Sequence, residues 1–179
     1  MFVSPGCKSH SISMKTTKDI LSKRKRTWTP FRVEIRKLVE KLHLSEDDFS
    51  EVPLNQWKEV KSKIWAKFSS NNNSKWIWET LSEPYASFPL NDEWLQIEEL
   101  IDSSEKLWFL FNEPLHEKTK FWVYEGITRA FEKIISASGY VDEILIVSKK
   151  YEWILIINHH NILIGTGKMK ERIEKRKKK

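Results

Sequence analysis

Two adjacent histidines, His159 and His160, are the clearest candidates for chemistry in this sequence. Imidazole is a common ligand of transition metals, and it can transfer a proton near neutral pH. Asn158 and Asn161 flank the pair, and both Asn and His tolerate the left-handed backbone that tight turns use. The string therefore has two interpretations, a metal-binding or catalytic pair and a structural hairpin turn, of which the turn is favoured.

Acidic partners for these histidines would have to come from a neighbouring strand. Glu152 and His159 lie seven residues apart along one expected strand, which corresponds to about 23 Å of extended chain, so they cannot share a site. Antiparallel pairing instead places the start of the preceding strand beside the histidine turn. Any metal-binding or acid–base site is therefore predicted to consist of Asp142, Glu143, His159 and His160.

A second group of polar residues occupies the opposite hairpin tip, at Lys149, Lys150, Tyr151 and Glu152. Such a tip could recognise a charged partner, although charged tips are commonly only hydrated, and that interpretation is favoured. Glu125 stands where a strand passes into a helix. It is either an acid stabilised by the helix dipole or a buried acceptor with a role, and the first is favoured.

Other signatures of catalysis or cofactor binding are absent from the sequence. It has no glycine-rich phosphate loop, nucleophile elbow, CxxC pair or HExxH motif. It does contain nine tryptophans, and exposed tryptophans can form aromatic cages or sugar platforms. Most of them fall on expected helical stripes or within expected strands, so core packing explains them. No cofactor is expected.

The elements that position these residues follow from the spacing of the apolar side chains. Helical periodicity occurs in four segments, at 31–42, 57–68, 91–101 and 127–138. Short β-favouring runs occur in five segments, at 107–111, 120–124, 144–147, 153–157 and 162–164. The connections between the last three runs are short enough to require antiparallel hairpins.

This order predicts an α+β domain in which N-terminal helices pack on a mainly antiparallel five-stranded sheet of ββαβββ order. The runs at 144–147 and 153–157 are apolar at consecutive positions, so both faces of the sheet must be covered. In the simplest arrangement the 127–138 helix covers one face and the N-terminal helices cover the other. A homodimer that buries one face is the alternative, so monomer and homodimer both stay open.

Charge is divided between the middle of the chain and its two ends. Residues 1–28 hold seven Lys/Arg and one Asp, and residues 168–179 hold eight Lys/Arg and two Glu, so each end carries +6. Residues 29–167 hold 16 basic and 22 acidic residues and carry −6. We expect a single acidic domain at 29–167, preceded by a disordered basic tail. Residues 168–179 should form a frayed or disordered basic extension, because they show almost no apolar face.

The cysteine content and the hydropathy indicate the compartment. Cys7 is the only cysteine, which excludes an intramolecular disulfide and fits a reducing environment. No apolar run approaches the roughly 18 residues that a membrane span needs. The N-terminus has no apolar run of signal-peptide length, and Met14 is an alternative start of translation. The expected location is the cytoplasm, with no membrane partner.

Several strings resemble a family of small uncharacterised bacterial proteins, over residues 30–167. They are Phe121-Trp122-Val123-Tyr124-Glu125-Gly126, Asp142-Glu143, the stretch 146–153, and Asn158-His159-His160. The family has no assigned activity. Its compact size and acidic body are similar in type to those of immunity proteins that neutralise toxins, whereas the basic ends of this chain depart from that type.

Three hypotheses of function follow, in order of preference. The first is a non-enzymatic binding protein, specifically an immunity-type inhibitor of a basic toxin domain, because an acidic body steers basic partners. Its predicted binding residues are Glu125, Lys149, Lys150, Tyr151, Glu152, Asn158, His159, His160 and Asn161. The second is a metal-assisted hydrolase or ligand-binding enzyme that uses Asp142, Glu143, His159 and His160. The third is nucleic-acid binding through the basic ends.

Overall fold

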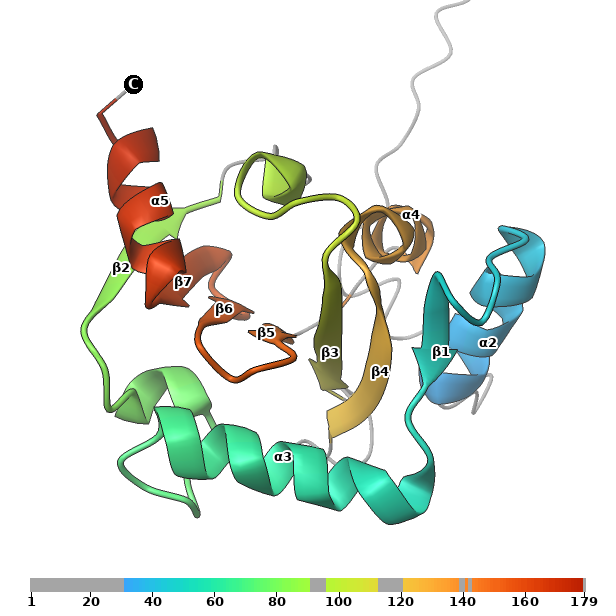
Figure 1. The fold of residues 1–179 in the computed structure, drawn as a ribbon, viewed down its shortest axis with the longest axis horizontal. Coiled ribbons are helices and arrows are strands. Elements are labelled where there is room, and N and C mark those ends of the chain that lie inside the picture. The colour runs from blue at the N-terminus through green and yellow to red at the C-terminus, as the bar shows by residue number, and fades with distance from the viewer. Residues whose placement is uncertain (1–30, 91–95, 113–120, 139–140, 142, 179) are drawn as a thin grey trace, which may run out of the picture.

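The computed structural model describes residues 31–90, 96–112, 121–138, 141 and 143–178 (Figure 1). The expected basic tail at 1–28 lies outside the described residues. In chain order the elements are α2 (Phe31–Lys41), β1 (Phe49–Glu51), α3 (Leu54–Phe68), the 3₁₀ helix η1 (Ile77–Thr80), β2 (Tyr85–Pro89), the 3₁₀ helix η2 (Gln96–Glu99), β3 (Lys106–Asn112), β4 (Phe121–Ile127), α4 (Thr128–Ser138), β5 (Ile144–Ser148), β6 (Ile154–Ile157), β7 (Ile162–Thr166) and α5 (Lys168–Arg176). None of the helices in these ranges is long and apolar enough to cross a membrane.

Seven strands form one antiparallel sheet in the order β1-β4-β3-β5-β6-β7-β2. The α+β class is confirmed, but the prediction of a five-stranded sheet is wrong. Two further strands, β1 and β2, extend the sheet at its opposite edges. β1 is only three residues long, and β2 contains a proline and pairs with β7, far along the chain. The local sequence pattern is weak in both segments. They adopt the β conformation through pairing with a strand that is distant in sequence.

Helices cover both faces of the sheet, as its consecutive apolar residues require. On one face, α2, α4 and α5 pack over side chains such as Phe109, Phe111 and Ile146. On the other face, α3 and η1 pack over Leu110 and Leu145. The prediction that the N-terminal helices cover the face opposite the 127–138 helix is wrong for α2, which lies on the same face as α4 (Figure 1). The chain changes face at β1, the edge strand between α2 and α3, so only the later helix reaches the other face.

The prediction of a frayed or disordered C-terminal extension is wrong for residues 168–176. They form α5, which packs along the sheet near β7 and β2 (Figure 1). Met169 and Ile173, four residues apart on one face of this helix, are both 0% exposed. Gly165 allows the close approach, because a Cβ at that position would lie 2.8 Å from atoms of both side chains. Two apolar residues in a strongly basic segment were too weak a pattern to indicate this packing.

Candidate functional site

The histidine string forms a tight turn between β6 and β7. The side chain of Asn158 is 2% exposed, and its Oδ1 accepts hydrogen bonds from the backbone N–H groups of His160 (3.1 Å) and Ile162 (3.0 Å). Asn161 has the left-handed backbone expected of a turn residue, with φ of 56°. The turn favoured from the residue types is therefore present, and Asn158 organises it while His159 and His160 are exposed.

The rings of the two histidines pack against two tryptophans. His159 lies 5.3 Å from Trp76 and 5.9 Å from Trp78, measured between ring centroids, and His160 lies 5.9 Å from Trp78. The two imidazole centroids are only 4.1 Å apart. The pair therefore sits in a cluster of four aromatic rings, a setting that the sequence did not indicate because η1 lies far away along the chain.

The register of the sheet brings Glu143 to the same end as the histidine turn. Ile144 pairs with Ile157, as antiparallel pairing predicted, and the Glu143 side chain is buried. Within the described ranges, no group of three His, Cys, Asp or Glu side chains is arranged to hold a metal ion. Asp142 lies outside those ranges, so the complete four-residue cluster stays a prediction.

The opposite hairpin tip joins Lys149 to Glu125. Lys149 Nζ lies 2.8 Å from Glu125 Oε2 and 3.0 Å from the centroid of the Trp108 ring. These residues meet because β3 lies between β4 and β5, and Trp108 pairs with Glu125 and Val147. Burial lowers the pKa of Lys149, while the hydrogen bond and the charge of Glu125 oppose that shift. The lysine is thus held against the sheet by an ion pair and a cation–π contact.

The remaining residues of that tip form a hydrogen-bonded turn. The Ser148 hydroxyl accepts a hydrogen bond from the backbone N–H of Glu152 (2.7 Å), and Tyr151 has a φ of 56°. Tyr151 is half-buried, and burial raises the pKa of its hydroxyl. Lys150 and Glu152 are exposed. The predicted binding residues therefore divide into two groups at opposite ends of β6, and they do not form one site.

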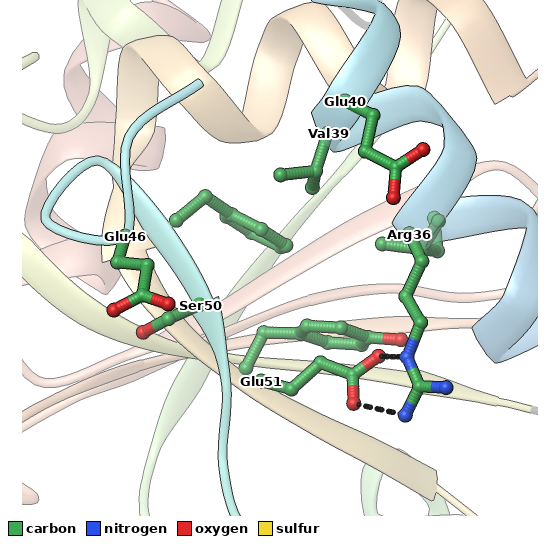
Figure 2. Close-up of a pocket in the computed structure, with 9 residues that line it drawn as sticks. Arg36, Val39, Glu40, Glu46, Ser50 and Glu51 are labelled. Atoms are coloured by element: carbon green, nitrogen blue, oxygen red, sulfur yellow. Dashed lines mark hydrogen bonds and ion pairs between the residues drawn. The ribbon is translucent and has the colours of Figure 1, made fainter. Parts of the chain in front are cut away.

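A groove between α2 and β1 lies at one edge of the sheet, and the sequence did not indicate it (Figure 2). Its volume is about 520 Å³, within the range of about 300–1,000 Å³ typical of ligand pockets. We call it the α2–β1 groove. It is lined by Ile35, Arg36, Val39, Glu40, Glu46, Phe49, Ser50, Glu51 and Tyr124.

The apolar part of the groove is buried and closely packed. Ile35 is fully buried and Phe49 nearly so. The Phe49 ring stacks on the Tyr124 ring, with centroids 5.1 Å apart and planes 21° from parallel. Stacked aromatic rings of this kind contribute about 0.5–1.5 kcal/mol beyond the burial of their area. The floor of the groove is therefore closely packed and almost fully covered, and Val39 is the apolar lining residue of intermediate exposure.

One wall of the groove carries a clamped carboxylate. Arg36 donates two hydrogen bonds to Glu51, from Nε to Oε1 at 2.7 Å and from a terminal nitrogen to Oε2 at 2.9 Å. Arg32 donates a third, from Nε to Oε2 at 2.7 Å. Burial alone would raise the pKa of Glu51, but the hydrogen bonds from the two arginines hold it below its ordinary value. Glu51 is therefore ionised, and the two guanidinium groups more than balance its charge.

Two further carboxylates give the groove and its two arginines a net charge of −1. Glu40 and Glu46 are both exposed, and neither makes an ion pair with any residue in the described part of the chain. Figure 2 shows Glu40 on α2 and Glu46 on the loop before β1, on opposite sides of the groove, with Val39 between them. The arrangement can accept a cationic group that carries an apolar stem.

A second carboxylate pair lies where η2 meets α4. The backbone N–H of Glu98 donates to Glu132 Oε1 at 3.0 Å. Burial, together with the negative charge of Glu98, raises the pKa of Glu132 to about 7. Arg129 and Lys133 line the same surface depression. Because Glu132 titrates near neutral pH, the stability of the contact between η2 and α4 should depend on pH.

Comparison with known proteins gave one match. A family model described as a family of unknown function (DUF6756) matches residues 27–177. The matched range includes the α2–β1 groove, both hairpin tips and α5. Searches of curated proteins and of solved structures returned no match.

Proposed function

The chain belongs to DUF6756, a family of unknown function, and we propose that it is a non-enzymatic binding protein whose α2–β1 groove holds a basic segment of a protein partner. The single observation that carries this proposal is the acidic rim of the groove over an apolar floor. The resemblance noted in the sequence agrees with this membership at the level of an uncharacterised family. The immunity-type role belongs to the proposal.

The chemistry of the groove fits a lysine or arginine side chain of the partner. The aliphatic stem of such a residue would pack on the half-buried Val39, while its charged head would reach Glu40 or Glu46. A half-exposed ion pair contributes only about 0.2–1 kcal/mol, so the apolar stem must supply much of the affinity. Glu51 would add little to binding, because Arg32 and Arg36 already occupy its oxygens.

The partner that we propose is a basic toxin domain, inhibited by occlusion of its surface. With the +3 of α5 added to the −6 of residues 29–167, residues 29–176 carry −3, and this smaller negative charge would still favour association with such a domain. The exposed residues of the hairpin tips, such as Lys150, Glu152 and His160, would act as outlying contacts. This assignment makes the groove the centre of the interface.

The test is affinity capture from the native host with three baits. The first bait is the wild-type chain, the second is Glu40→Gln/Glu46→Gln, and the third is the matched control Glu79→Gln/Glu171→Gln. The control changes the net charge by the same amount at two exposed carboxylates, in η1 and in α5. A basic protein should be recovered by the wild type and by the control and be depleted at least several-fold by the groove variant.

The recovered partner should then bind the purified chain in calorimetry, with the same order among the three baits. Expressed alone, it should arrest growth, and co-expression of the wild-type chain should restore growth. Equal capture by all three baits would show that the groove is not the binding surface. A captured partner without toxicity would remove the immunity role and leave the binding role standing.

A further inference from the structure

We propose that the chain's own basic segment at residues 23–26 docks in the α2–β1 groove and competes there with external partners. This inference rests on the groove being the binding surface of the proposed function. The segment reads Lys-Arg-Lys-Arg and lies only four residues before α2 begins at Phe31. Its composition matches what the groove accepts, namely cationic heads on long aliphatic stems.

The distances permit this contact. Five residue steps separate Arg26 from Phe31, and an extended chain covers up to about 18 Å over that length. Glu40 lies nine residues beyond Phe31 on the same helix, which corresponds to about 13.5 Å at 1.5 Å per residue. The segment can therefore fold back along α2 and reach the Glu40 side of the groove, and Lys23 has further length to cross toward Glu46.

The groove carboxylates are available for this contact. Glu40 and Glu46 have no ion pairs within the described ranges, whereas the exposed carboxylates of Glu59 and Glu99 are paired with Lys63 and Arg176. The quartet of positive charges would therefore meet the groove carboxylates without displacing an existing cation. Docking needs no rearrangement of the Glu51 clamp.

The short tether sets the expected population of the docked state. Tethering over a few residues gives an effective concentration of about a millimolar. A contact with a dissociation constant of the same size would be occupied about half of the time. Such occupancy weakens binding of an external partner about twofold, because only the open fraction can bind it. The segment would thus act as a weak internal competitor.

Paramagnetic relaxation in the full-length chain tests the docking. Cys7 is the only cysteine, so the variant Cys7→Ser/Ser22→Cys carries one nitroxide directly before the basic quartet. Docking predicts strong broadening of the backbone amides of Glu40, Glu46 and Ser50, reversed when the nitroxide is reduced. The broadening should fall at least by half in Glu40→Gln/Glu46→Gln and remain in the control Glu79→Gln/Glu171→Gln.

Two results would overturn the inference. The first is broadening that stays the same in the groove variant, since an undocked tether would broaden nearby amides regardless of groove charge. The second is broadening that also appears in an isotope-labelled, spin-free chain mixed with spin-labelled copies, which would show contact between molecules.

A peptide arm separates failure of this inference from failure of the proposed function. In the full-length chain with residues 23–26 changed to glutamine, a synthetic peptide of residues 20–29 is added, and amide shifts are followed at Val39, Glu40 and Ser50. Shifts from the peptide without tethered broadening would leave the groove as a site for basic segments and remove the self-docking. Absence of both would remove the groove as a basic-segment site altogether.

Discussion

Replacing Ile173 with alanine should destabilise the whole domain, although the residue lies in a basic segment near the C-terminus. Its side chain is 0% exposed and touches the position where a Cβ of Gly165 would lie. Removing three buried carbon groups costs about 2.4 kcal/mol of transfer free energy at about 0.8 kcal/mol each. The cavity left behind raises the total to about 3 kcal/mol, within the range measured for such changes.

Urea denaturation followed by tryptophan fluorescence measures this loss as a lower midpoint at constant m-value. Ile173→Val should lose only about 0.5–1.5 kcal/mol. Glu171→Ala is the matched control, because Glu171 is exposed on the same helix, and its effect should stay within about 0.5 kcal/mol. An Ile173→Ala loss no larger than that of the control would refute the packing of α5 on the sheet.

Three further predictions concern pH, turn and packing. The pKa of Glu132 is raised to about 7 in the folded state. Protonated Glu132 therefore favours folding at low pH, and this contribution to the free energy of unfolding is lost as the pH rises through 7. Glu132→Gln should therefore be more stable than wild type by about 1 kcal/mol at pH 8, after allowance for solvent screening. The gain, measured by urea denaturation, should shrink at pH 5. Equal gains at pH 5 and pH 8 would contradict this prediction. Asn158→Ala leaves two turn N–H groups without their acceptor and should cost about 1–3 kcal/mol in thermal melting, while Asn158→Asp should retain most of the stability. Gly165→Ala should cost about 1–3 kcal/mol in urea by overpacking α5, and a neutral effect would argue against the close approach.

Local pattern in the sequence determined the centre of the fold. The five strands from β3 to β7 and the helix α4 were predicted close to their observed bounds, because apolar runs and turn residues act over a few neighbouring positions. The turn at Asn158 was predicted for the same reason, since an Asn side chain bonds the backbone two residues ahead. The need to cover both faces of the sheet also followed from consecutive apolar residues.

Tertiary structure decided the edges of the sheet and the candidate site. β1 and β2 are strands only because β4 and β7 lie beside them, and α5 is anchored by two side chains that meet Gly165. The α2–β1 groove exists because Glu40 and Glu46, from different segments, are held on opposite sides of an aromatic floor. Contacts between segments distant in sequence leave no periodic signal in either one, so spacing alone does not indicate them.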